Sequence, residues 1–247
     1  MSLPQWINVE VTAVADAPTL IVHNVFGDEG TAIPLDIKAA LVDTDGSETL
    51  SAIISGVPDG ATLTKGTNLG GGAWQLFGQA DIQSVGILKG DNETFVLNVV
   101  ATATETDPNG MPQSADSSDV MQVVVSNVPP TPMLDDVIVL GNSLGPVDEL
   151  TVVPGLSLTL VVSTTDAAFP DTQDAPFDFT IDFGDGIGVF SGTASAEQEQ
   201  LMFPYKYTTL GNFEVSLTVV DKDQGSTTVS PLTTITVKEI TTIDGIA

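Results

Sequence analysis

The sequence predicts an all-β protein that consists of two tandem antiparallel β-sandwiches. Apolar and polar residues alternate with the period of a half-buried strand, and turn dipeptides separate these alternating runs. A proline-rich stretch near the middle divides the runs into two groups. With 247 residues, the chain is long enough for two domains that each bury a core.

The individual strands are predicted from this alternation. One face is apolar over residues 94–104, 177–183 and 213–219, as in strands that pack one side against a core. No stretch combines helical spacing, capped ends and sufficient length, so we expect no helix. Turns are expected where Asp or Asn precedes Gly or where glycines cluster, at Asp45-Gly46, Asp59-Gly60, Gly70-Gly71-Gly72, Asn109-Gly110 and Asp185-Gly186.

Prolines mark the expected domain boundaries. Residues 1–17 are expected to hold the start of the chain together with the last strand and linker of an upstream repeat, because alternation over residues 7–13 is followed by Asp16-Ala17-Pro18. The chain would then belong to a longer tandem array. The other expected segments are a first sandwich at 18–127, a stiff proline linker at 128–132, a second sandwich at 133–238 and a tail at 239–247.

Charge excludes several classes of partner. The chain has 33 Asp and Glu residues against 6 Lys and no Arg, and its formal net charge is −27. Nucleic acid is excluded as a partner because phosphate binding depends on basic side chains, and an anionic membrane surface is disfavoured for the same reason. No apolar run reaches the length of a membrane span. The absence of Cys excludes disulfides, thiolate metal sites and a thiol nucleophile.

The sequence offers little for catalysis, and we expect neither a catalytic residue nor an enzyme. His23 is the single histidine and therefore the only base available to a Ser-His-Asp arrangement. Residues 70–72 lack the Lys-Ser/Thr that follows a phosphate loop. Counting residues leaves a glycosidase-like carboxylate pair open, but nothing in the sequence organises such a pair into a cleft.

Two resemblances extend this interpretation. Residues 18–127 resemble the cadherin-like repeat of giant bacterial surface adhesins, through the segments at 31–37, 43–50 and 54–63. Residues 133–238 resemble a polycystic-kidney-disease-type domain, through Ile181-Asp182-Phe183-Gly184-Asp185-Gly186 and the segment at 207–221. Both resemblances imply seven-stranded sandwiches of immunoglobulin type, which determines the loops that meet at each pole.

That topology implies two groups of calcium ligands. At the amino-terminal pole of the first domain it gathers Asp16, Asp43, Asp45, Glu48, Glu105 and Asp107. At the junction between the domains it gathers Glu29, Asn127, Asp166, Asp171, Asp221 and Asp223. Two carboxylates about 5 Å apart repel by about 3 kcal/mol at an effective dielectric of about 20. Calcium suits such sites because it accepts six to eight oxygen ligands in a tolerant geometry.

Each of these residues also has a plainer interpretation. For any single Asp-Gly turn, and most of all for residues 182–186, turn chemistry is the favoured explanation, whereas several carboxylates at one pole favour a metal. His23 is expected to be a surface or partly buried side chain rather than a ligand. Trp6, Trp74 and Phe77 are expected in the core, with stacking against a sugar as the alternative.

The resemblances imply a non-enzymatic segment of a large bacterial cell-surface or secreted protein. It would act outside the cell as a calcium-stiffened spacer or adhesion module. Its partners would be neighbouring repeats of the same protein and a cell-surface glycan or protein ligand, with no membrane insertion of this segment. The alternative is a carbohydrate- or matrix-binding accessory module of a secreted hydrolase.

Overall fold

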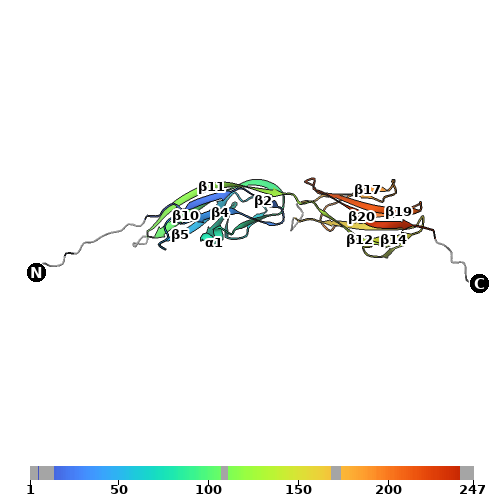
Figure 1. The fold of residues 1–247 in the computed structure, drawn as a ribbon, viewed down its shortest axis with the longest axis horizontal. Helices are drawn as coiled ribbons and strands as arrows, with labels where there is room; N and C mark the ends of the chain where they lie inside the picture. The colour runs from blue at the N-terminus through green and yellow to red at the C-terminus, as the bar shows by residue number, and fades with distance from the viewer. Residues whose placement is uncertain (1–4, 6–13, 107–110, 168–173, 240–247) are drawn as a thin grey trace, which may run out of the picture. The chain divides into compact units, whose positions relative to one another are not determined.

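The computed structural model describes residues 5, 14–106, 111–167 and 174–239. The chain divides into two compact units, Met1–Ser126 (unit 1) and Asn127–Ala247 (unit 2), and each has its own hydrophobic core (Figure 1). The all-β prediction is confirmed, because every regular element of the described residues except one helical turn is a strand. No helix in the described part of the chain has the length and apolarity needed to cross a membrane.

Unit 1 consists of short strands, two long strands that form a hairpin, and one turn of helix. Its elements are β1 (Thr19–His23), β2 (Val25–Asp28), β3 (Ala32–Pro34), β4 (Asp36–Ala40), β5 (Glu48–Ser55), β6 (Ala61–Leu63), β7 (Thr67–Gly70), β8 (Ala73–Phe77), α1 (Gln79–Ile82), β9 (Gly86–Lys89), β10 (Glu93–Thr106) and β11 (Pro112–Ser126). The single helical turn, α1, was not expected from the sequence.

The core of unit 1 lies between one large sheet and two small ones. The large sheet has the order β2-β11-β10-β5-β8-β7, and the small sheets are β1-β4 and β3-β9-β6. Leu97 and Val99 of β10 pack in one cluster with Ile37 of β4 and Ile87 of β9, and all four are almost completely buried. The alternation that predicted a strand over 94–104 is therefore the inward face of β10.

Unit 2 also encloses a core, between one sheet of four strands and one of five strands. Its strands are β12 (Thr131–Val139), β13 (Asn142–Ser143), β14 (Glu149–Val152), β15 (Ser157–Thr165), β16 (Phe177–Asp182), β17 (Val189–Ala194), β18 (Leu201–Lys206), β19 (Gly211–Val220) and β20 (Ser226–Val237). The sheet β13-β12-β15-β18 faces the sheet β14-β20-β19-β16-β17 across a core to which β15, β16 and β19 contribute. The strands predicted over 177–183 and 213–219 are confirmed as β16 and β19.

Two details of the sequence prediction need correction. The sheets are not purely antiparallel, because β2 pairs with β11 and β14 pairs with β20 in parallel. Alternation does not encode strand direction, since parallel and antiparallel strands share the same period of two. The expected linker is also shorter than 128–132, because β12 begins at Thr131 and pairs with β15 from its first residue.

An aromatic cluster connects the two sheets of unit 2. Phe183, directly after β16, stacks on Tyr205 of β18, with ring centroids 4.1 Å apart. The hydroxyl of buried Tyr207 donates a hydrogen bond to the carbonyl oxygen of Phe183 at 2.8 Å. Gly184 has a φ of 77°, and a Cβ there would lie 2.4 Å from the carbonyl oxygen of Glu214, so only glycine fits this turn.

The two tyrosines provide a test of this cluster. Burial, and then the hydrogen bond to Asp185 and its negative charge, raise the pKa of Tyr205 to about 12. Burial also raises the pKa of Tyr207. Both pKa values lie above the ordinary tyrosine value near 10. The contribution of the two protonated tyrosines to the stability of unit 2 is therefore complete below about pH 10, and it is lost as the pH rises through their folded-state pKa values.

We expect the phenolate absorbance of the folded protein to increase only well above pH 10, and that of the urea-unfolded protein to increase near pH 10. Because Tyr205 and Tyr207 are the only tyrosines in the chain, the absorbance reports on this cluster alone. Titration of a folded tyrosine at its ordinary pKa would contradict this packing of the two rings.

Candidate metal centres

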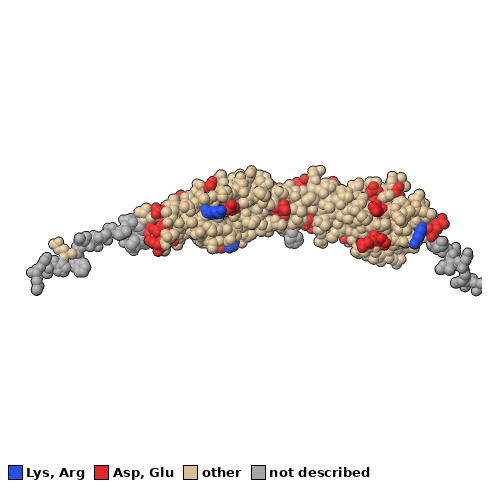
Figure 2. All heavy atoms as spheres, viewed as in Figure 1, with Lys and Arg blue, Asp and Glu red and all other residues tan. Residues whose placement is uncertain are grey.

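One end of unit 1 gathers carboxylates from three segments of the chain. The loop between β4 and β5 carries Asp43 and Asp45, β5 begins at Glu48, and β10 nears its end at Glu105. Strand pairing places Glu48 directly opposite Glu105. Figure 2 shows acidic side chains grouped at one end of unit 1. The adjacency that the resemblance implied for these loops therefore follows from the register of β5 and β10.

Glu48 is the carboxylate at this end with the least solvent contact. Its side chain is 7% exposed, and its Oε1 accepts a hydrogen bond from the backbone N–H of Asp16 at 2.8 Å. Within the described part of the chain, its Oε2 is buried and has no hydrogen-bond partner. A buried acceptor without a partner costs about 1–3 kcal/mol, and like charges directly opposite each other on paired strands add to this cost.

The basic side chains of unit 1 are engaged elsewhere. Its three lysines are Lys38, Lys65 and Lys89, and they lie within 4 Å of carboxylate oxygens of Asp36, Asp81 and Glu93. Glu48 and Glu105 therefore face each other without a lysine to neutralise them. The arrangement fits an additional cation better than it fits two carboxylates alone.

Asp43 and Asp45 are mainly turn-forming residues. Asp43 Oδ1 accepts a hydrogen bond from the N–H of Asp45 at 2.9 Å, and Asp45 Oδ1 accepts bonds from the hydroxyl and the N–H of Ser47. The two bonds from Ser47, most of all the one from its hydroxyl, lower the pKa of the exposed Asp45 carboxyl. Each aspartate keeps a second oxygen that these bonds do not use, so turn formation leaves one oxygen of each for a cation.

The described carboxylates at this end do not form a tight cluster of oxygen atoms. Among the described residues, no three of the predicted ligands at this end have oxygen atoms that all lie within 4.8 Å of one another. Asp107, which the sequence analysis placed in the same group, lies outside the described residues. The predicted group is therefore brought to one end by the fold, but its described oxygens are not preassembled into a tight cage.

Glu29 lies at the opposite end of the large sheet, after β2. Its side chain is completely buried, and its N–H donates a hydrogen bond to the carbonyl oxygen of Ser126 at 3.0 Å. A carboxylate oxygen of Asp91 lies within 4.8 Å of one of its own. The sequence analysis missed Asp91, because the pairing depends on the turn before β10 meeting the turn after β2.

In unit 2, Asp221 organises the turn between β19 and β20. Its Oδ1 accepts hydrogen bonds from the N–H groups of Asp223 and Gly225, both at 2.8 Å, and its Oδ2 accepts one from Asn127 Nδ2 at 3.0 Å. Gly225 lets the turn approach this carboxylate closely, because a Cβ would lie 2.3 Å from Asp221 Oδ2 and would displace it. Two predicted metal ligands, Asp221 and Asn127, are thus brought together, and the hydrogen bond between them fixes the start of unit 2.

Asp223 forms an ion pair with a lysine that also contacts a second aspartate. The ammonium group of Lys222 contacts Asp223 Oδ2 and also lies 3.0 Å from Asp174 Oδ1. Asp174 is completely buried, and the sequence analysis missed it because nothing in its local pattern predicts burial of an isolated loop aspartate. Lys222 thus supplies positive charge to both of these carboxylates.

Two predicted ligands of unit 2 remain, and the structure describes one of them. Asp166 lies directly after β15, where its Oδ1 accepts a hydrogen bond from the N–H of Ala167 at 2.6 Å and its own N–H donates to Glu197 Oε1 at 3.1 Å. Asp171 lies outside the described residues. The bond from Ala167 is typical of a loop aspartate whose side chain folds back on the neighbouring backbone.

The turn at residues 182–186 follows the structural interpretation. Asp182 Oδ1 accepts the N–H of Gly184, and Asp185 Oδ1 accepts the N–H groups of Ile187 and Gly188. Burial raises the pKa of Asp185, but hydrogen bonds from the Tyr205 hydroxyl and these amides outweigh burial and lower it overall. Both aspartates therefore hold a turn against the aromatic cluster.

His23 lies at the surface, as expected. Its side chain is 57% exposed, and Nδ1 lies 2.8 Å from Asp36 Oδ2. None of the hydroxyl side chains in the described ranges hydrogen-bonds to the ring. The pair therefore resembles a surface ion pair more than two members of a nucleophilic triad.

The expected core aromatics behave differently from one another. Trp74 packs against the core of unit 1, as predicted, whereas Phe77 is 62% exposed, which corrects the prediction that it is buried. The physical reason is strand parity, since residues three apart on β8 point to opposite faces. Trp6 lies outside the described residues.

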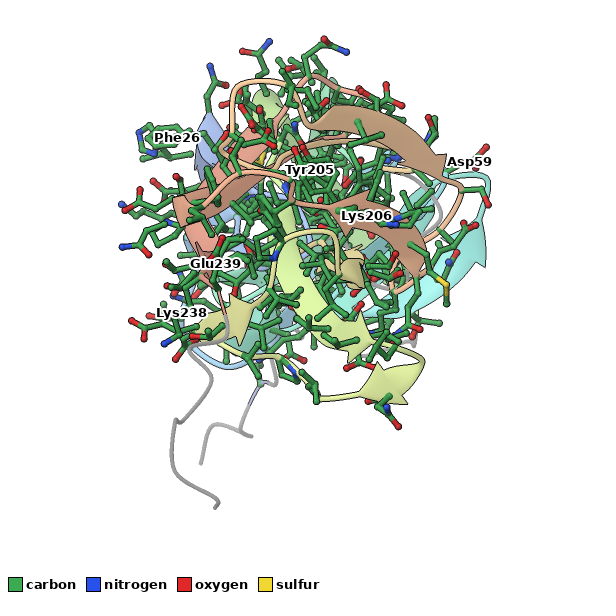
Figure 3. All side chains as sticks on the ribbon, turned by 90° about the vertical axis from the view of Figure 1, so that its right-hand side faces the viewer. Phe26, Asp59, Tyr205, Lys206, Lys238 and Glu239 are labelled. Carbon is green, nitrogen blue, oxygen red and sulfur yellow. The ribbon has the colours of Figure 1, made fainter. Side chains whose placement is uncertain are left out.

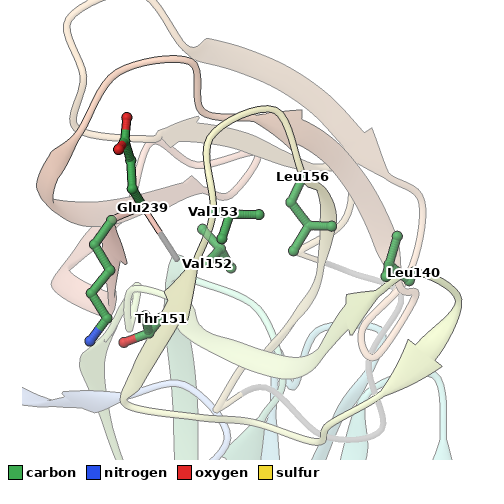
Figure 4. A pocket seen from close by; sticks show the side chains of 7 residues that line it. Leu140, Thr151, Val152, Val153, Leu156 and Glu239 are labelled. Atoms are coloured by element: carbon green, nitrogen blue, oxygen red, sulfur yellow. The ribbon is translucent and has the colours of Figure 1, made fainter. Parts of the chain in front are cut away.

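An apolar hollow of about 480 Å³ lies in unit 2 (Figure 4). Figure 4 shows the side chains of Val152, Val153, Leu156 and Leu140 around it, and the lining also includes Thr151, Lys238 and Glu239. Its charged lining residues are neighbours in the chain and form no carboxylate pair. This hollow therefore provides neither the donors of a metal site nor the paired acids of a hydrolase.

Comparisons with known proteins leave the family of this chain open. No family model matches the chain, and no curated protein matches it. The chain is similar to fibronectin(III)-like modules of Clostridium thermocellum CbhA, with 16% identity over 90% of this chain and 94% of that chain and a TM-score of 0.31. It is also similar to the FN1–FN3 domains of chicken CNTN1, with 9% identity over 88% and 67% of the two chains and a TM-score of 0.30. Likenesses this low support no conclusion about the chain.

Substitution of Asp221 tests the turn that holds Asn127. We expect Asp221→Ala to destabilise unit 2 by about 3 kcal/mol, because it leaves two N–H groups and the Asn127 amide without their acceptor. Asp221→Asn should cost only about 1 kcal/mol, since its oxygen can accept the two N–H groups and its amide can donate to a rotated Asn127. Urea unfolding followed by the tyrosine signal measures unit 2, and equal losses in both variants would contradict this account.

Proposed function

We propose that this chain is a non-enzymatic, extracellular pair of immunoglobulin-like modules from a bacterial cell-surface or secreted protein, and that it acts as a calcium-stiffened spacer. The cadherin-like and polycystic-kidney-disease-type resemblances of the sequence support this proposal. The high negative charge supports it as well, because repulsion between copies opposes their association.

One observation carries the calcium part of the proposal, namely the buried Oε2 of Glu48. That oxygen has no hydrogen-bond partner in the described structure, and Glu105 lies directly opposite. Calcium is a hard cation that would supply the missing positive charge and accept several oxygen ligands from both strands and the adjoining loops. Glu48 and Glu105 would hold it, with Asp16, Asp43 and Asp45 available from the neighbouring segments.

The donor set favours calcium over other metals. The oxygens at this end belong to carboxylates, carbonyls and hydroxyls, and the only histidine pairs with Asp36 elsewhere in unit 1. Oxygen-only sites suit calcium and magnesium rather than zinc or copper. Loops that bring their ligands from separate segments suit calcium better than magnesium, because magnesium demands a near-ideal octahedron.

The variant Glu48→Gln separates a metal ligand from a merely buried acid. In chelator, we expect it to unfold at a higher temperature than the native protein, because the buried charge opposite Glu105 is removed. In calcium, we expect the native protein to gain about 2.7 kcal/mol at a calcium concentration one hundred times Kd, and the variant to gain much less. Thermal unfolding followed by tryptophan fluorescence measures unit 1, which contains both tryptophans.

Asp59→Asn is the matched control for this experiment, since Asp59 is an exposed turn acid of the same unit. It should respond to calcium as the native protein does. A native protein that ignores calcium, or a Glu48→Gln variant that responds as strongly as the native protein, contradicts the proposed site. Titration calorimetry with calcium provides the same distinction without heating.

The stiffening itself rests on the sequence resemblance and has a separate test. We expect calcium to narrow the distribution of distances between a label on unit 1 and a label on unit 2, measured by single-molecule energy transfer on the whole chain. Identical distributions in calcium and in chelator would remove stiffening from the proposal, and would leave calcium binding by unit 1 to be judged from the Glu48→Gln experiment.

A further inference from the structure

The large sheet of unit 1 carries a hollow on its outer face, one row of paired residues from Glu48 and Glu105, whose side chains alternate to the opposite face of the sheet. The hollow measures about 780 Å³ and is formed where β8 ends beside β5 and β10. Its lining residues are Thr49, Leu50, Ser51, Gln75, Phe77, Gly78 and Thr104. Strand pairing aligns them in rows, because Thr49 lies opposite Thr104 and Ser51 lies opposite Phe77.

Phe77 gives this hollow an exposed aromatic side. Its neighbour Leu76 points into the core and is fully buried, whereas Phe77 points outward and is 62% exposed. The next row of the same face contains Ile53, which is 40% exposed and lies opposite Gln75. An aromatic ring beside a shallow hollow offers a flat apolar surface that water solvates poorly.

The other lining groups are polar and uncharged. Hydroxyl groups come from Thr49, Ser51 and Thr104, and an amide comes from Gln75. In the part of the chain that the structure describes, the side chains of Ser51 and Gln75 have no hydrogen-bond partner, so both remain available to a ligand. The hollow thus combines one apolar face with free donors and acceptors.

Charge then limits the class of ligand. None of the seven lining residues carries a charge, although the chain as a whole has a formal net charge of −27. The overall field repels an anionic ligand and opposes a second copy of this chain, and a cationic ligand would find no carboxylate within the hollow. An uncharged ligand with apolar faces and hydroxyl groups matches both the absence of charge in the lining and its combination of an aromatic ring with polar groups.

We infer that this hollow binds a neutral polysaccharide. The C–H face of one sugar ring would lie on Phe77, and the hydroxyl groups of that sugar and its neighbour would exchange hydrogen bonds with Ser51 and Gln75. Calcium would not contact this ligand, because the lining contains no carboxylate and the side chains of Glu48 and Glu105 lie on the opposite face of the same strands. It supplies the chain with a binding activity that the spacer role does not require.

Affinity electrophoresis and titration calorimetry with soluble neutral polysaccharides test this inference, with xyloglucan, galactomannan and mixed-linkage β-glucan as probes. Alginate and polygalacturonate serve as anionic counterparts. We expect at least one neutral probe to bind, with the same affinity in calcium and in chelator. Binding of none of the neutral probes, or of the anionic probes alone, overturns the inference.

Variants locate the site. We expect Phe77→Ala to weaken binding about tenfold and Phe77→Tyr to retain it, because the flat ring and not its exact identity provides the stacking surface. The matched control is Phe26→Ala, since Phe26 lies on β2 of the same sheet, is 82% exposed and projects from the strand (Figure 3). Equal losses from both substitutions would show that binding is not located at the hollow.

A last pair of outcomes separates the glycan from a peptide. Gln75→Ala and Ser51→Ala should each weaken polysaccharide binding several-fold, while the melting temperature of unit 1 stays unchanged because both side chains lie on the outer face. An uncharged, unfolded peptide that binds with the same dependence on Phe77, in the absence of polysaccharide binding, would overturn the assignment to a sugar. Loss of the calcium response in Glu48→Gln leaves this inference untouched, so the two proposals fail separately.

Discussion

Repulsion between two carboxylates that strand pairing brings together is the constraint on which the acidic end of unit 1 depends. Glu48 and Glu105 face each other because β5 and β10 pair in that register, and the same register aligns the apolar residues that form the core of unit 1. A shift by one residue would relieve the repulsion but would turn the whole apolar face toward water. The core therefore holds the charges together.

Several acids of unit 2 are compensated by groups of the protein itself. Asp221 binds two backbone N–H groups and the amide of Asn127, and Asp174 and Asp223 share the ammonium group of Lys222. These solutions differ because a turn offers amides at short range, whereas a pair of opposed strands uses its amides in the ladder. Glu48 lies on such a strand, which explains why its second oxygen has no hydrogen-bond partner among the described residues.

The acidic end of unit 1 and the hollow beside Phe77 support different proposals. The net charge of −27 opposes association of copies, while the seven residues that line the hollow beside Phe77 carry no charge. A spacer needs only the first property. The proposed polysaccharide site uses the second without disturbing the core, because the residues involved alternate with those that pack inward.

The sequence by itself determined the all-β class, the main strands and the acidic character, because period-two alternation and composition are local properties of the chain. The parallel pairing of β2 with β11, the outward position of Phe77 beside a hollow and the burial of Glu48 were decided by the tertiary structure. The alternation of side chains along a strand predicts that Phe77 and Trp74 point to opposite faces. It does not predict which residues of other strands lie beside Phe77. Burial of Asp174 beside Lys222 depends on loops packing over the end of a sheet, and such contacts have no period that a sequence can reveal.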